Sequence, residues 1–166
     1  MQKVTHDSEV VARGQQVITA CAFIHHNFDG MEKVFLAKRA DTKKFLPGVY
    51  EIPGGHINFG EDIVAGLKRE VMEELEMEVD VGDPFDVLAY VNEVRGSHSV
   101  QIMYFARFKG PLEQIQFHPE DHSTCGWFAE NELPHAYTSA KGEEDPEFKS
   151  IKKGFSLLKG NMLRFG

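Results

Sequence analysis

Eight consecutive residues near the start of the chain restrict its fold more than any other segment. Residues 17–24 read Val-Ile-Thr-Ala-Cys-Ala-Phe-Ile, a run that is continuously apolar or β-branched. A strand with one exposed face would alternate between apolar and polar residues, so an unbroken run predicts a strand buried on both faces. We therefore expect residues 17–24 to form a central strand of a sheet.

The other elements follow from turn residues and from the spacing of apolar residues. An Asn/Asp/Gly turn over residues 27–30 separates the first run from a second strand over 33–39, which predicts a hairpin. Pro-Gly pairs on both sides leave room only for a brief strand over 49–52. Further strands are expected over residues 85–94, 99–108 and 126–129, helices over 62–75 and 146–159, and a polar loop over 118–124.

Strands in hairpins with two well separated helices predict an α/β fold, an α/β/α sandwich with a mixed β-sheet between helices. No repeat, low-complexity tract or linker divides the 166 residues, a length that suits one domain. We expect residues 1–15 to form an N-terminal lead-in and residues 16–166 to form a single domain.

The charge of the chain excludes one class of partner and points to a cation. The formal net charge is −8, and basic residues occur only in short runs. The chain lacks the broad basic stripe that binds a nucleic-acid backbone, so long nucleic acid is excluded as a partner. The same acidity would repel a small phosphorylated substrate unless divalent cations in the site reversed the local field.

No apolar run reaches membrane-spanning length, and the first residues do not have the pattern of a signal peptide. We therefore expect a cytoplasmic protein that binds no membrane. Cys21 and Cys125 belong to no CxxC or Cys/His cluster and are expected to be buried small residues.

The expected helix over residues 62–75 carries three glutamates on one side. Glu70, Glu73 and Glu74 are three and four residues apart, so they share a sector of roughly 100° beside the apolar stripe of the helix. Carboxylates this close repel one another, but a hard divalent cation would coordinate them, which predicts a site for Mg²⁺ with Mn²⁺ as a substitute. Arg69 stands four residues before Glu73 and is expected to orient that carboxylate through a charge-assisted hydrogen bond.

A solvated acidic helix face is the alternative interpretation, since Glu-rich surface helices are common. The order of the surrounding residues favours the metal site. A glycine turn, an acid six residues after Gly55, and an Arg-Glu pair directly before the acidic pair occur at fixed distances.

Residues 55–77 resemble the Nudix box, G-x5-E-x7-R-E-U-x-E-E-x-G-U, in which U is a bulky aliphatic residue. Eight of the nine defined positions match, namely Gly55, Glu61, Arg69, Glu70, Val71, Glu73, Glu74 and Met77. The ninth is Glu76, which replaces a glycine. Such a glycine leaves the helix in a left-handed conformation, which costs other residues about 1 kcal/mol, so the loop geometry is put in question.

The resemblance implies a Nudix-type sandwich and a metal-dependent hydrolase. Its substrate would be a small nucleotide-like molecule, cleaved at a diphosphate bond in a nucleoside triphosphate or another nucleoside diphosphate derivative. The resemblance implies that Glu70, Glu73 and Glu74 hold the metal, with the Gly55 carbonyl as a further oxygen ligand. Water would then attack phosphorus.

The resemblance leaves the general base open. Glu70 is the first candidate, and Glu120 and Asp121 in the polar loop are the alternatives. Arg39 could hold a phosphate through two hydrogen bonds, although a surface cation is nearly as good an interpretation. Aromatic residues near these segments are expected in the core rather than stacked on a base, namely Phe45, Tyr50 and Phe117.

Two other functions compete with hydrolysis. Residues 38–50 also resemble isopentenyl-diphosphate isomerase, but that enzyme needs a cysteine near the histidine after the glycine turn, where this chain has Gly54 and Gly55. A non-catalytic sensor of nucleotide derivatives is the other, although such modules often lose the box carboxylates. The box does not encode the nucleotide, and it leaves a homodimer open.

Overall fold

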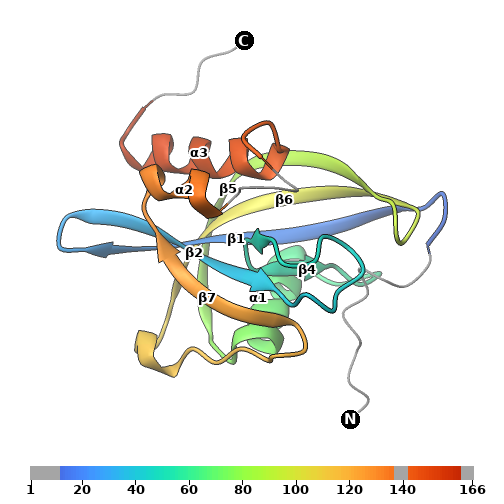
Figure 1. The fold of residues 1–166 in the computed structure, drawn as a ribbon, viewed down its shortest axis with the longest axis horizontal. Coiled ribbons are helices and arrows are strands. Elements are labelled where there is room, and N and C mark those ends of the chain that lie inside the picture. Colours follow the sequence, from blue (N-terminus) through green and yellow to red (C-terminus); the bar gives the residue numbers. More distant parts are fainter. Residues whose placement is uncertain (1–11, 137–141, 162–166) are drawn as a thin grey trace.

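The computed structural model describes residues 12–136 and 142–161. Within these residues, seven strands form one mixed sheet with the order β3-β2-β1-β6-β5, and β4 and β7 add to β1 and β2 (Figure 1). The strands are β1 (Gln16–Phe28), β2 (Met31–Arg39), β3 (Tyr50–Glu51), β4 (Gly54–His56), β5 (Val79–Asn92), β6 (Ser97–Phe108) and β7 (His122–Phe128).

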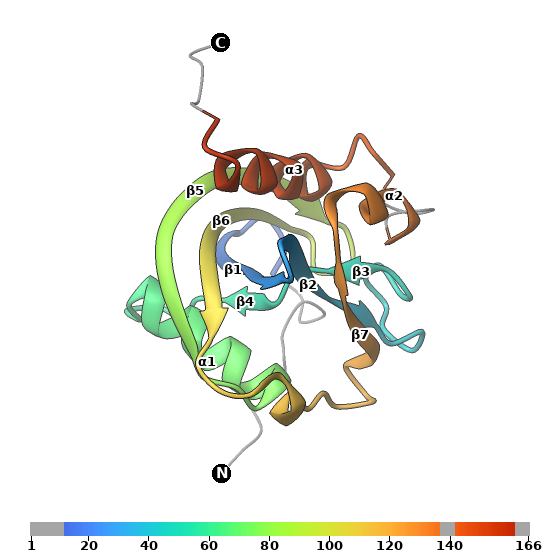
Figure 2. The same ribbon diagram turned by 90° about the vertical axis from the view of Figure 1, so that its left-hand side faces the viewer.

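Helices cover both faces of the sheet. The described helices are α1 (Ile63–Leu75), the short α2 (Leu133–Ala136) and α3 (Pro146–Leu158), besides two 3-10 turns. Figures 1 and 2 show α1 on one side of the sheet and α3 on the other. The α/β/α sandwich predicted from the sequence is confirmed.

β1 occupies the middle of the sheet, as its apolar run predicted. It pairs in parallel with β6 and antiparallel with β2 and β4. Successive side chains of a strand point to opposite faces. Accordingly Ala20 and Ala22 belong to the core on the α1 side, and Cys21 and Phe23 to the core on the α3 side. This double burial explains why the segment contains almost no polar residue.

Three strands differ from the sequence prediction. β5 begins at Val79, six residues before the expected start, because register shifts around Pro84 let the edge strand continue past a residue that cannot donate a hydrogen bond. β7 begins at His122, inside the expected polar loop, since His122 pairs with Arg39. Residues 54–56 form β4 against β1 rather than only a turn.

α1 begins and ends where the sequence indicates. The side chain of Asp62 caps the helix by accepting a hydrogen bond from the Ala65 N–H at 2.9 Å. Leu67, Val71 and Leu75 are fully buried against the sheet. Glu76 ends the helix with a φ of 54°, in the left-handed conformation that the missing glycine would adopt. The substitution therefore leaves the backbone path unchanged.

In the described residues, no helix has the length and apolar character needed to cross a bilayer. Cys21 is buried and Cys125 is partly buried, and both are free thiols. Most of the lead-in expected over residues 1–15, namely residues 1–11, lies outside the described part of the chain.

Candidate active site

The three glutamates of α1 differ in their exposure. Glu70 and Glu74 are 4% and 6% exposed, whereas the side chain of Glu73 is 37% exposed. The difference arises because Glu70 and Glu74 flank the apolar stripe that packs on the sheet, so the fold carries these two carboxylates into the interior. Buried carboxylates are costly unless cations or hydrogen-bond donors accompany them.

Arg69 joins four parts of this region. Its Nε and Nη2 atoms donate to the two carboxylate oxygens of Glu61 at 2.7 and 2.9 Å. Its Nη1 donates to Glu70 at 3.0 Å and to Glu73 at 3.3 Å, and Nη2 also reaches the His56 carbonyl at 3.0 Å. Arg69 therefore contacts Glu73, as the sequence predicted, and also ties α1 to the glycine segment before it.

These contacts change the acid-base properties of the pair. The hydrogen bond from Arg69 lowers the pKa of Glu61 to about 2. The bond to Glu61 and the charges of Glu70 and Glu73 raise the pKa of Arg69, against the effect of burial. Glu61 is thus ionised at neutral pH and holds the arginine in place through two hydrogen bonds.

Glu74 faces the glycine segment instead of Arg69. Its Oε2 accepts a hydrogen bond from the Gly54 N–H at 3.4 Å. Gly54 has a φ of 149°, and a Cβ there would stand 2.1 Å from the Ala20 carbonyl oxygen. Only glycine permits this close approach of β4 to β1, which brings the β4 backbone up to Glu74.

The acids have the right chemistry for a hard cation but do not converge on one point. Three carboxylates and the Gly55 carbonyl are oxygen donors of the kind that Mg²⁺ prefers. Among residues 12–136 and 142–161, no three His, Cys, Asp or Glu side chains lie in a metal-binding arrangement. Arg69 holds Glu70 and Glu73 while Glu74 turns to Gly54, so coordination by all three requires side-chain rotation.

Two hollows adjoin these acids and share His56 in their linings. The first, which we call the sheet cavity, has a volume of about 430 Å³ and includes Glu74 and Gly55 in its lining. The second, the loop groove, has a volume of about 660 Å³ and includes Glu70 and Glu73. Other residues of the sheet cavity are Cys21, Arg39, Phe45, Glu51, His56, Tyr90, Gln101 and Glu147, and others of the loop groove are Gln16, His56, Asn58, Glu61, Arg69 and Arg95.

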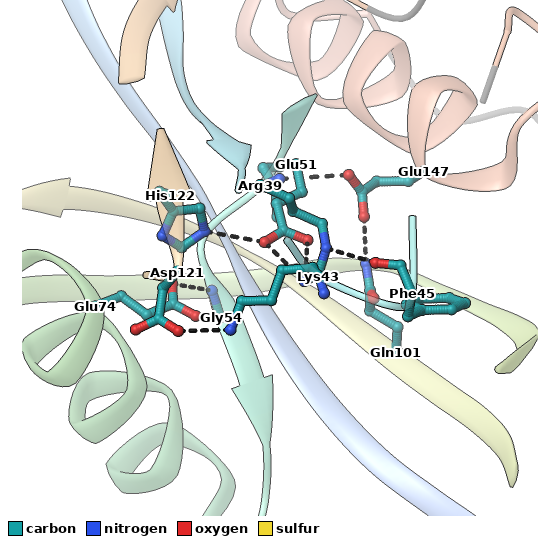
Figure 3. Close-up of polar contacts among 11 residues, drawn as sticks. Arg39, Lys43, Phe45, Glu51, Gly54, Glu74, Gln101, Asp121, His122 and Glu147 are labelled. Carbon is teal, nitrogen blue, oxygen red and sulfur yellow. Dashed lines mark hydrogen bonds and ion pairs between the residues drawn. The ribbon is translucent and has the colours of Figure 1, made fainter. Parts of the chain in front are cut away.

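Arg39 lies in the wall of the sheet cavity, 8% exposed (Figure 3). Its Nη1 donates to both oxygens of Glu51 at 3.3 Å, and its Nε donates to the Phe45 carbonyl at 2.9 Å. Within the described residues, its buried Nη2 has no hydrogen-bond partner. Arg39 is therefore a buried cation rather than a surface one. Glu51 and the Phe45 carbonyl hold it in place, and its Nη2 group can donate to a ligand.

His122 holds Glu51 from the other side. Its Nε2 lies 3.0 Å from Glu51 Oε1, and the residue is 3% exposed. Burial lowers the pKa of His122, but the hydrogen bond to Glu51 and the charges of Glu74 and Glu51 outweigh it and raise the pKa. The charge of Glu51 is thus shared between His122 and Arg39.

The two candidate bases in the loop before β7 differ in position. Glu120 is exposed, whereas Asp121 is partly buried and forms an ion pair with Lys43 at 2.6 Å. Figure 3 shows Asp121 near Glu74 and Gly54. The expectation that Phe45 lies in the core is wrong, since Phe45 lines the sheet cavity. Tyr50 and Phe117 do pack against the core.

Sequence reasoning missed several residues that the fold brings to the site, namely Glu51, Arg95, Gln101, His122 and Glu147. Each belongs to a different segment, and no local motif marks it. Their places depend on how strands and helices meet in the fold. His122 reaches the site by pairing with Arg39, and Arg95 lies in the β5-β6 hairpin, 2.8 Å from His56.

Comparison with known families gives one match that covers most of the chain. A family model described as the NUDIX domain matches residues 17–148. The curated relatives include the Nudix hydrolase YfcD of Salmonella typhi, 32% identical over 79 residues, and that of Escherichia coli K12, 30% identical over 79 residues. The aligned stretch spans 43% of this chain and 43% or 44% of these relatives.

Solved structures share the fold over a longer span. A MutT NUDIX hydrolase from Burkholderia pseudomallei superposes with a TM-score of 0.66 at 26% identity, covering 84% of this chain and 98% of that one. A C. elegans Ap4A hydrolase gives a TM-score of 0.69 at 20% identity, covering 87% of this chain and 99% of that one. At 20% identity the second likeness concerns the fold alone.

Proposed function

The chain belongs to the NUDIX domain family, and from that premise we propose that it is a metal-dependent hydrolase of a small nucleotide. The bond cleaved is a diphosphate bond, in a nucleoside triphosphate or in a nucleoside diphosphate linked to another group. The observation that best supports this proposal is the burial of two acids of one helix beside the two hollows, Glu74 in the sheet cavity and Glu70 in the loop groove.

In this proposal Glu70, Glu73 and Glu74 hold Mg²⁺, or Mn²⁺ in its place, together with the Gly55 carbonyl. When bound, the cation would neutralise phosphate charge and lower the pKa of an attacking water. Arg69 orients Glu70 and Glu73 through the hydrogen bonds described above.

Glu70 is the base that we assign first. It would accept the proton of the water as the water oxygen bonds to phosphorus and the phosphate leaving group departs. Its burial supports this assignment over Glu120, which is exposed. Asp121 is the alternative in the loop before β7, where it forms an ion pair with Lys43 at 2.6 Å.

Arg39 would bind a phosphate oxygen of the substrate. Its Nη2 is a buried donor without an acceptor in the described residues, and a phosphate oxygen would supply one. Glu51 and the Phe45 carbonyl hold the rest of the guanidinium in position.

The test is turnover of a nucleotide panel with Mg²⁺ or Mn²⁺, read as phosphate released after pyrophosphatase treatment. Glu70→Gln and Glu73→Gln should each reduce turnover by about 10²- to 10⁴-fold while the fold is retained. Glu78→Gln is the matched control, since Glu78 is exposed and lies beyond the helix. Near-normal turnover in both site variants would refute the assigned roles.

A second function has one observation in its favour. Cys21 is opposite Gly54 in the β1-β4 register and lines the sheet cavity, so a thiol does lie beside the glycine turn although it is distant in sequence. An isopentenyl-diphosphate isomerase needs a cysteine in that neighbourhood. Isomer formation by the wild type, abolished in Cys21→Ala, would favour this function over hydrolysis.

A further inference from the structure

The sheet cavity has a polar end that the chemistry at Glu74 does not use. Figure 3 shows Gln101 and Glu147 on one side of the Arg39-Glu51 pair, and Gly54 and Glu74 on the other. Gln101 comes from β6 and is 3% exposed, and Glu147 comes from the first turn of α3. A carboxylate and an amide from separate elements therefore meet in the wall of the sheet cavity.

Hydrogen bonds fix both side chains. Gln101 Nε2 donates to Glu147 Oε2 at 3.3 Å and lies 3.3 Å from the sulfur of Met103. Glu147 Oε1 accepts from the Ile52 N–H at 3.3 Å. A carboxylate can accept several hydrogen bonds at once, so donors of a ligand can be added to these.

Two aromatic rings line the same cavity. The rings of Phe45 and Tyr90 lie within 15° of parallel with their centroids 6.2 Å apart, and both line the cavity. Burial raises the pKa of Tyr90, so its hydroxyl stays neutral. Ligand pockets commonly combine aromatic walls with a few polar groups that fix orientation, and aromatic walls suit a planar ring.

We propose that Gln101 and Glu147 select the base of the substrate and that the preferred base is guanine. This inference rests on the proposed function, because it assumes that a nucleotide enters the sheet cavity. Guanine presents a carbonyl oxygen followed by two adjacent N–H donors along one edge. Gln101 Nε2 donates to Glu147 and to the sulfur of Met103 in this structure. A thioether sulfur is a weak acceptor, so guanine binding would exchange that bond for one from Gln101 to the carbonyl, and the two oxygens of Glu147 match the donors.

The other bases place an acceptor against Glu147. Adenine has an unprotonated ring nitrogen beside its amino group, cytosine has the same pattern, and uracil and thymine flank their single N–H with two carbonyls. An acceptor held against a carboxylate loses a hydrogen bond and adds repulsion, while the charged bonds to guanine are among the stronger ones. Discrimination therefore depends on the charge of Glu147.

The experiment measures binding of GDP, IDP and ADP by titration calorimetry in the presence of EDTA, so that hydrolysis does not enter. Wild-type protein should bind GDP at least about tenfold more tightly than ADP. IDP lacks the 2-amino group and should fall between them. Glu147→Gln replaces one acceptor by a donor, so it should weaken GDP binding and strengthen ADP binding.

The matched control is Glu144→Gln, because Glu144 is exposed, lies two positions before the start of α3 and forms an ion pair with Lys149. It should keep the wild-type order of affinities, and a melting curve checks that both variants fold. Equal affinities for GDP and ADP in the wild type, or an unchanged preference in Glu147→Gln, would overturn the proposal. Guanine preference without any turnover would instead refute the hydrolase and leave the base selection standing.

Discussion

Arg69 is the residue that connects the parts of the candidate active site. It bonds to Glu61 and the His56 carbonyl before the helix and to Glu70 and Glu73 on the helix. A guanidinium can do this because it presents five N–H donors in a fixed plane, which a lysine could not match. The sequence predicted the contact with Glu73 from spacing alone, since residues four apart on a helix are neighbours.

The contribution of His122 to stability should depend on pH. Its folded pKa is raised above the ordinary value of 6.5, so its contribution to stability is fully present below that pH and is lost as the pH rises through the folded pKa. His122→Gln should therefore destabilise the protein more at pH 6 than at pH 9. Urea unfolding of wild type and variant at both pH values measures this difference.

The opposite order, with the larger loss at pH 9, would show that His122 is neutral beside Glu51. His135→Gln is a suitable control. His135 is exposed and, within the part of the chain that the structure describes, it does not hydrogen-bond to a buried acid.

Among the elements of the site, helix α1 is the one that the sequence predicts best. The backbone conformation at the C-terminal end of this helix is the feature that the sequence predicts least. The cap, the apolar stripe and the acidic face depend on residues within four positions of one another. The exit at Glu76 adopts a φ of 54°, although a non-glycine residue disfavours it. The surrounding contacts impose this conformation, and the sequence by itself does not reveal it.

Replacing Glu76 tests whether its positive φ strains the backbone. Glu76→Gly should stabilise the protein by up to about 1 kcal/mol, because glycine adopts a positive φ without steric cost. Glu76→Ala is the control, since it removes the 3.5 Å contact with His118 but keeps the strain. Chemical denaturation compares the three proteins, and equal stability of the glycine and alanine variants would show that the exit is not strained.

Helix α3 packs so closely on the sheet that Gly154 has no room for a side chain. A Cβ at Gly154 would lie 2.8 Å from a ring carbon of Phe23, which is fully buried and held by Phe85, Phe105 and Phe155. Overpacking costs about 1–3 kcal/mol, more than the roughly 1 kcal/mol that alanine gains over glycine in a helix.

Gly154→Ala should therefore lower the free energy of unfolding, as measured by thermal and urea melts. Gly82→Ala is the control, because its Cβ would meet its nearest neighbour at an ordinary 3.5 Å. A Gly154→Ala protein more stable than the wild type would show that α3 can move away from Phe23.

For the whole molecule, the sequence predicted the individual strands and helices. It did not predict the side-chain contacts that depend on how the strands pair. The central strand, the hairpins and both long helices follow from patterns within single segments. The pairs Cys21 with Gly54, Glu51 with His122 and Gln101 with Glu147 join residues 33, 71 and 46 positions apart. No pattern within one segment could bring them together, because the pairing and curvature of the sheet decide which side chains meet.

The same sheet explains why the site lies where it does. β4 approaches β1 through Gly54, and α1 follows directly, so the glycine segment and the acidic helix face meet at the middle of the molecule. We expect the glutamates of α1 to take up a divalent cation there, even though Arg69 donates hydrogen bonds to Glu70 and Glu73 in this structure.

The most direct test is a Mn²⁺ titration of the purified protein followed by electron paramagnetic resonance. We expect saturable uptake at or below millimolar Mn²⁺, weakened at least about tenfold in Glu74→Gln and unchanged in Glu78→Gln. Absence of uptake by the wild type at several millimolar Mn²⁺, or equal affinity in Glu74→Gln, would contradict this expectation.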